Sequence, residues 1–184
     1  PDEIYSTRVG TGMADLVIGC DVIVTAGRDA LTRMREGRTH AAINSTVSPT
    51  AAFVRNPNWT FPEASAENDI RNACGKDRAD FIDASNIATS LMGDSIATNM
   101  FMLGYAWQKA WVPLSEAAIM KAIELNGVSI DFNKQAFNWG RQAAHDLLSV
   151  ENAAKANSTV SQVIEFKRTP TLKDIVDKRF NFLV

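Results

Sequence analysis

The sequence predicts an α/β fold, in which a mostly parallel sheet of few strands with crossover helices is followed by a helical C-terminal part. Two observations lead to this prediction. Short apolar segments at residues 14–19, 41–44 and 79–84 alternate with helical patterns. Residues 86–148, by contrast, show helical patterns only. Alternating strands and helices are typical of parallel strands joined by crossover helices.

In the first half, residues 14–19 are a short apolar run that ends in a glycine and is typical of a buried strand, and residues 41–44 and 79–84 are two further strand candidates. Asp21 is expected to cap a helix over residues 22–36, where apolar residues recur at helical spacing and a glycine follows. After the second strand, a Pro- and Asn-rich connection over residues 55–63 leads to a helix over residues 64–74. The third strand, at residues 79–84, completes the predicted sheet.

The second half is expected to consist of helices bounded by capping residues, prolines and glycines. Ser85 is expected to cap the first helix, and Asp94 or Ser95 the second. These helices are predicted over residues 86–92, 96–110, 116–125 and about 131–148. Residues 151–161 are polar and rich in Ala and Asn, which predicts a linker, and a strand over 162–166 and a helix over 172–179 follow. We therefore divide the chain into residues 1–150 and residues 151–184, the latter a linker and the start of a following segment.

The composition is that of an ordinary globular protein. Of the 184 residues, 46% are hydrophobic and 22% charged, and the net charge is −2, so no nucleic-acid partner is expected. The longest apolar runs fall well short of the roughly 20 residues of a membrane helix, and we expect no membrane partner. Cys20 and Cys74 form no metal or redox motif; buried, inert thiols and a cytoplasmic location are expected. The apolar end at residues 182–184 suggests a piece of a longer protein.

Isolated motifs in the chain are weak. Gly10-Thr11-Gly12 lacks the preceding strand and third glycine of a dinucleotide-binding loop, so we expect a turn. His40 and His145 lack the spacing of metal ligands, and no metal site is predicted. Asp80 and Asp83 end a predicted strand, where α/β folds bind ligands, although they could equally be solvated ends.

The segment over residues 91–109 is the richest in signals. Asn99 lies beside an apolar stripe and is expected to be buried, where its amide must bond a loop or a ligand. Thr98 and Gly104 are small enough for a backbone or a ligand to approach closely. The stripe itself follows helical spacing, is predicted to be core, and consists of Ile96, Met100, Leu103 and Trp107.

Two of these segments resemble a known family. DFIDA at residues 80–84 and LMGDSIATNMFMLGYA at residues 91–106 are similar to the gamma, or catalytic, domain of 2-oxoacid:ferredoxin oxidoreductases. The similarity is greatest to the long, fused indolepyruvate ferredoxin oxidoreductase branch, and it covers about residues 1–150 as a partial gamma domain. The Gly-rich loop that opens this domain in the family has no counterpart in the chain. Supporting similarity is found at residues 14–21, 44–53 and 136–141.

The resemblance implies an enzyme that oxidatively decarboxylates a 2-oxoacid, indolepyruvate or another aryl or branched one. It implies thiamine diphosphate with Mg²⁺, coenzyme A, and iron–sulfur clusters that pass electrons to ferredoxin. Gly93, Asp94, Thr98 and Asn99 match the family motif and are the candidate contacts with coenzyme A, thiamine or a neighbouring domain.

Other parts of the same enzyme are implied as partners, in a homo-oligomer. The chain lacks a thiamine motif and a cysteine set for a cluster, and no catalytic residue is identified. We therefore expect it to be inactive alone and to hold none of these cofactors by itself. Two alternatives remain: a non-catalytic interaction module and an independent nucleotide-binding α/β domain. Arg141 could bind a phosphate or carboxylate, or form a surface ion pair.

Overall fold

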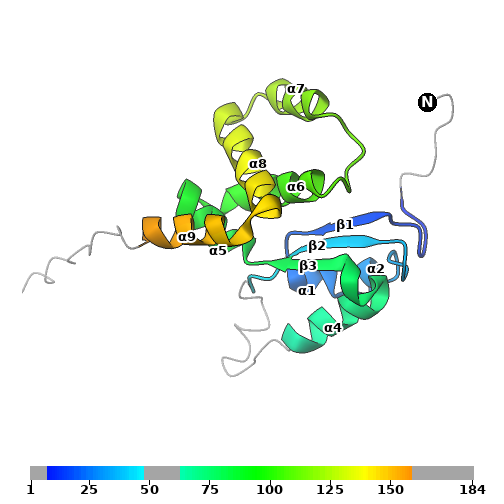
Figure 1. Ribbon diagram of the computed structural model, residues 1–184. Helices are drawn as coiled ribbons and strands as arrows, with labels where there is room; N and C mark the ends of the chain where they lie inside the picture. Colours follow the sequence, from blue (N-terminus) through cyan, green and yellow to red (C-terminus); the bar gives the residue numbers. More distant parts are fainter. Residues whose placement is uncertain (1–7, 48–62, 159–184) are drawn as a thin grey trace, which may run out of the picture.

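The computed structural model describes residues 8–47 and 63–158. Within them, β1 (Leu16–Gly19), β2 (His40–Asn44) and β3 (Ala79–Ile82) form a parallel sheet in the order β1-β2-β3. Helices lie on both faces of this sheet, and the helical part of the chain follows it (Figure 1). The predicted fold class is confirmed: the three strands pair in parallel and are joined by crossover connections that contain helices.

The side chains of the sheet alternate between two cores, as the pleat requires. Ala41 and Ile43 of β2 face the first helical layer, where they pack with Ile70 of α4. Ala42 of β2 and Ile82 of β3 face the second layer. Ala41, Ala42 and Ile43 are all fully buried, so the central strand is apolar on both faces.

The first layer contains α1 (Val22–Thr25), α2 (Arg28–Leu31) and α4 (Glu63–Cys74), and η1 (Lys76–Arg78) leads from α4 into β3. Asp21 caps α1 as predicted, its carboxylate accepting from the amides of Ile23 and Val24. The single helix predicted over residues 22–36 is wrong. Gly27 has an extended backbone, with φ −68° and ψ 150°, and divides the segment into two short helices.

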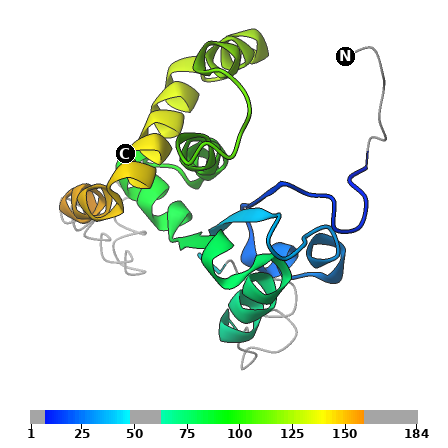
Figure 2. The same ribbon diagram turned by 45° about the vertical axis from the view of Figure 1, so that its right-hand side comes forward.

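The second layer contains α5 (Ala84–Met92), η2 (Ser95–Ala97), α6 (Thr98–Gln108), α7 (Glu116–Asn126), α8 (Ile130–His145) and α9 (Leu147–Ser158). In both views α7 and the adjoining end of α8 stand away from the sheet (Figures 1 and 2). Ser85 lies inside α5 rather than capping it, because Asp83 occupies the N-cap position. None of the helices in the described ranges is long and apolar enough to cross a membrane.

The linker predicted from residue 151 is wrong over residues 151–158, which form most of α9. Val150 and Ala154 lie one turn apart and are buried in the same core as Ile87 of α5. The polar Ala- and Asn-rich composition conceals this narrow apolar face. The strand and helix predicted beyond residue 161, like most of the connection at residues 55–63, lie outside the described residues, and the division near residue 150 stays a prediction.

Helix α6 is the centre of the second layer. Its fully buried side chains are Phe101, Met102 and Ala106, whereas Ile96, predicted to be core, is 69% exposed. The other three residues of the predicted stripe are half-buried against α7 and α8. The prediction was partly wrong because α6 is covered on two sides, so that no single stripe marks its buried face.

The crossing of α6 and α8 is unusually close. A Cβ atom on Gly104 would lie 2.0 Å from the carbonyl oxygen of Phe137, and one on Gly140 would lie 1.8 Å from that of Phe101. Each helix therefore presents a glycine to the backbone of the other. This confirms the close approach predicted at Gly104 and identifies its partner as the backbone of α8.

Candidate functional site

The carboxyl ends of the three strands are held together by Asn44, the last residue of β2. Its side chain is almost completely buried. The amide nitrogen donates to the carbonyl oxygen of Cys20 (3.0 Å) and to Ser85 Oγ (2.9 Å). The amide oxygen accepts from the backbone amides of Thr46 (3.3 Å) and Ser85 (3.2 Å). All of its hydrogen-bonding capacity is thus used, and Asn44 fixes this edge of the sheet.

Beside this clamp, Asp83 follows β3 at the same edge, as the sequence predicted. Its carboxylate accepts from the Thr46 hydroxyl and from the Asn86 amide nitrogen, at 3.0 and 2.9 Å to its two oxygens. Asp83 and Asn86 border two hollows, of about 490 and 250 Å³. The larger also includes Ser45, Thr46 and Glu67, and the smaller extends between α5 and α9.

The lining of these hollows determines which ligands would suit them. Hydroxyl, amide and carboxylate groups predominate in the larger one, with the acidic Asp83 and Glu67 and no basic side chain among its lining residues. Such groups bind ligand hydroxyls or amines better than phosphates. Ligands in open α/β sheets bind at this edge, which makes it a candidate site.

Asp80, the other predicted carboxylate, is not at this edge. It lies within β3, where Oδ2 accepts from the Tyr105 hydroxyl (2.8 Å) and pairs with Lys109 Nζ (3.1 Å). Burial, together with the adjacent carboxylate, raises the pKa of Tyr105 and keeps its hydroxyl protonated as the donor. Asp80 therefore joins the sheet to α6.

The four residues carried over from the family motif have different surroundings. Gly93 ends α5 with φ +81°, and Asp94 caps η2 through a 2.9 Å bond from the Ile96 amide, as predicted. Thr98 is buried; its hydroxyl donates to the carbonyl oxygen of Ser95 (2.6 Å) and also lies within hydrogen-bonding distance of Ser85 Oγ (3.1 Å). Asn99 is exposed, so its predicted burial is wrong.

These positions show how the motif is connected to the edge of the sheet. Thr98 bonds Ser85, which bonds Asn44, so one chain of hydrogen bonds leads from α6 to the strand ends. Gly93, Asp94 and Asn99 lie on the surface outside the two hollows at this edge. A ligand role for the four residues stays a prediction. The sequence interpretation missed Asn44 as a structural clamp, although a polar residue ending an apolar strand was a usable signal.

His40 begins β2 at the opposite edge of the sheet. Its ring stacks on Trp111, with centroids 4.7 Å apart, and its Nε2 lies 2.9 Å from Arg78 Nη1. A guanidinium can only donate, so Nε2 accepts and the proton is assigned to Nδ1, which is buried without a partner among the described residues. Burial and the Arg78 charge lower the pKa of His40. Within the described ranges, no three His, Cys, Asp or Glu residues are grouped to hold a metal ion.

The remaining candidates are structural. Arg141 pairs with Glu116 (2.8 Å) and lies 4.8 Å over the Trp107 ring, which confirms the ion-pair alternative. Cys74 is fully buried, as expected, and Cys20 is half-buried. Burial raises the pKa of both thiols. Residues 10–12 form a turn with Gly12 at φ +65°, as predicted.

Comparison with known proteins gives one finding. The sequence profile of the family described as pyruvate ferredoxin/flavodoxin oxidoreductase matches residues 1–143. No curated protein and no solved structure shows a significant match to the chain. The matched range includes the sheet, the edge held by Asn44, and the motif at residues 91–106.

Proposed function

Because the chain belongs to the pyruvate ferredoxin/flavodoxin oxidoreductase family, we propose that it is one α/β part of an enzyme that oxidatively decarboxylates a 2-oxoacid to an acyl-coenzyme A. Electrons pass to ferredoxin through clusters on other parts of that enzyme. The observation that carries the proposal is the family match over residues 1–143. An aryl or branched 2-oxoacid such as indolepyruvate is the substrate we propose, on the resemblance of residues 80–84 and 91–106.

The chain's own residues limit which cofactors it can hold. An iron–sulfur cluster takes four cysteine thiolates, and the sequence has two cysteines. Cys74 packs with β2 and α4, while Cys20 packs against the other core, so even these two do not form a pair. No electron-transfer step is therefore assigned to this chain, and we propose that the clusters, thiamine diphosphate and Mg²⁺ are held by other parts of the enzyme. A cytoplasmic homo-oligomer remains part of the proposal.

We propose that the chain contributes to the assembly through the surface formed by Gly93, Asp94 and Asn99, which faces a cofactor or a neighbouring domain. The Asp94 residue that caps η2 and Asn99 in the first turn of α6 are both exposed. Polar groups in this position can hydrogen-bond coenzyme A or thiamine, or fix a neighbouring domain. Thr98 fits a supporting role, because its hydroxyl is buried and already bonded twice.

The decisive experiment uses the assembled, cofactor-loaded enzyme that contains this chain. We expect 2-oxoacid- and coenzyme A-dependent reduction of ferredoxin, measured with indolepyruvate, a branched 2-oxoacid and pyruvate in parallel. Absence of turnover with every 2-oxoacid in a fully loaded assembly would contradict the proposal. Faster turnover of pyruvate would contradict only the choice of substrate.

Single alanine variants separate an enzyme site from an interaction module. Asn99→Ala is expected to lower turnover at least tenfold while assembly is unchanged. Asn152→Ala, which also removes an exposed asparagine from a helix, is the matched control and should leave turnover unchanged. If Asn99→Ala instead reduced assembly, while the fraction that still assembled had normal activity, a non-catalytic interaction module would be supported.

A further inference from the structure

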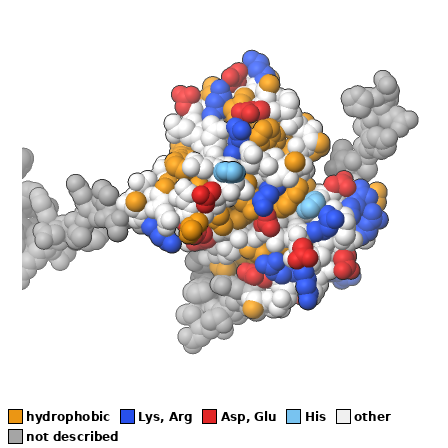
Figure 3. All heavy atoms as spheres, in the orientation of Figure 1, with side chains coloured by type: hydrophobic (Ala, Val, Ile, Leu, Met, Phe, Trp, Pro, Cys, Tyr) orange, Lys and Arg blue, Asp and Glu red, His pale blue; other side chains and the backbone are white. Residues whose placement is uncertain are grey.

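A basic hollow lies at the amino ends of the strands, on the opposite edge of the sheet from Asn44. It has a volume of about 520 Å³ and is formed mainly by the connection between α4 and β3. Its lining includes three cations, Arg71, Lys76 and Arg78, and two carboxylates, Glu36 and Asp77. In the lower right of Figure 3, the surface of this part of the molecule carries Lys and Arg side chains interspersed with Asp and Glu side chains.

The two arginines are held by neutral groups. Arg71 Nη1 donates to the carbonyl oxygens of Lys76 (3.3 Å) and Ala79 (3.1 Å). Arg78 Nη1 donates to the neutral imidazole of His40. These bonds, together with the stacking of Arg71 over the Phe81 ring (4.5 Å), fix the orientation of both guanidinium groups, and neither group forms an ion pair with a described carboxylate. Because the orientation is already set, a bound anion would cost less side-chain entropy.

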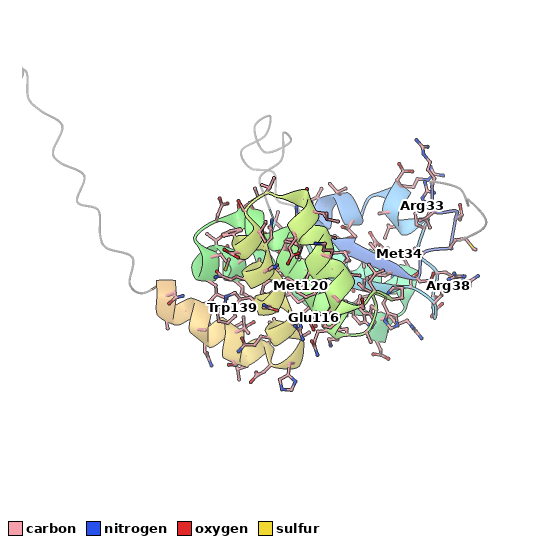
Figure 4. The ribbon with its side chains drawn as sticks, turned by 90° about the horizontal axis from the view of Figure 1, so that it is seen from above. Arg33, Met34, Arg38, Glu116, Met120 and Trp139 are labelled. Carbon is pink, nitrogen blue, oxygen red and sulfur yellow. The ribbon has the colours of Figure 1, made fainter. Side chains whose placement is uncertain are left out.

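Other cations near this edge are paired with carboxylates. Arg38 lies 2.8 Å from Asp15, and Lys109 lies 3.1 Å from Asp80. Figure 4 shows Arg38 on the side of the molecule that contains the sheet, and Trp139 of α8 on the helical side. Among the ion pairs formed between described residues, by contrast, none includes the three cations of the hollow.

Two glycines leave the hollow open. Gly37 and Gly75 both border it and both have positive φ, +76° and +108°. Their backbones are adjacent, because the Gly37 amide donates to the carbonyl oxygen of Cys74 (3.1 Å). A Cβ atom on Gly37 would meet nothing within 4 Å, so the glycine is required by its positive φ and not by crowding.

We propose that this hollow binds the phosphate group of a small phosphorylated ligand. Guanidinium groups match phosphate oxygens with paired hydrogen bonds, and Lys76 adds a third cation. The two carboxylates reduce the net charge of the lining to +1, from three cations and two anions. The volume falls within the roughly 300–1,000 Å³ of small-molecule sites, far more than a lone phosphate ion needs. The proposal does not depend on the function proposed above.

The test is an NMR titration of the ¹⁵N-labelled 184-residue chain at constant ionic strength. Inorganic phosphate is compared with AMP, glycerol phosphate and phenyl phosphate. We expect saturable shifts in the amide signals of Gly37 and Gly75. Lys76→Gln should weaken binding about tenfold, since it removes one charge-assisted hydrogen bond. Lys121→Gln removes the same charge from the exposed surface of α7 and should bind like the parent chain.

Three results would overturn the proposal. The first is the absence of saturable shifts with phosphate and with all three esters. The second is unchanged binding by Lys76→Gln, which would place the anion elsewhere. The third is equal affinity for phosphate and the esters, because a free ion would then be sufficient; tighter binding of at least one ester supports a phosphorylated ligand.

Discussion

Gly104→Ala tests the contact that joins α6 to α8. The new Cβ atom would lie 2.0 Å from the carbonyl oxygen of Phe137, whereas real Cβ atoms essentially never approach closer than 3.0 Å. The helices must therefore separate by at least the difference, 1.0 Å. Separation also loosens Phe101 and Phe137, which are at most 1% exposed.

The expected change in stability follows from two opposing effects. Overpacking a core costs about 1–3 kcal/mol, and here backbone rather than a flexible side chain must move, so we take the upper end. Alanine in place of glycine within a helix returns about 1 kcal/mol. The net loss is about 2 kcal/mol, which corresponds to a fall in Tm of about 4–8 °C for a chain of this size.

Urea denaturation followed by circular dichroism measures this loss. Ala122→Gly, at an exposed position of α7, is the matched control, because it exchanges the same two residues without a tertiary contact. It should cost about 1 kcal/mol from helix propensity alone. If the Gly104→Ala variant were as stable as the parent chain, the reasoning would be refuted. Adding Gly140→Ala should cost less than the sum of the two single changes, because one separation of the helices relieves both contacts.

Two further predictions concern the two edges of the sheet. Asn44→Ala should lower the free energy of unfolding, measured in urea, by about 3 kcal/mol, because it leaves several buried groups without hydrogen-bond partners. The control Asn152→Ala, at an exposed position, should change the free energy of unfolding by less than about 0.5 kcal/mol. Equal effects of the two variants would contradict the role of Asn44 as a clamp. The lowered pKa of His40 means that the unfolded chain binds its proton more tightly, so stability should fall as the pH decreases through 6.5 to the folded-state pKa. His40→Gln should remove this part of the pH dependence, and identical pH profiles of parent and variant would refute it.

The central strand of the sheet could be predicted because it contains a continuous apolar run. Residues 41–43 are buried on both faces, and such a strand needs no alternating pattern to be recognised. The helix predicted over residues 22–36 failed because apolar spacing continues across Gly27 while the backbone does not. Most of α9, residues 151–158, was missed for the opposite reason, since two buried residues on one face sufficed to fold a polar segment. The second error arises where tertiary contacts override the local pattern, and the first where a glycine interrupts it.

The candidate site was only partly predictable. Asp83 was placed at the strand end by chain order alone, because all carboxyl ends of a parallel sheet share one edge. The hydrogen bonds that Asn44 makes to Cys20 and Ser85 depend on three segments that meet only after folding. The contact of His40 with Arg78 and Trp111 likewise joins residues far apart in sequence. Spacing rules contain no information about such pairs.

The motif at residues 91–106 contains residues that the fold explains and one that it does not. Thr98 bonds Ser85, Gly104 admits α8, and Gly93 and Asp94 form the turn between α5 and α6. No such structural role explains Asn99, because its side chain is exposed and forms no hydrogen bond with another described residue. A helix at an exposed position favours alanine over asparagine. Asn99→Ala should therefore leave stability unchanged or slightly raised, so that any loss of turnover it causes in the assembled enzyme must come from a contact outside the described residues.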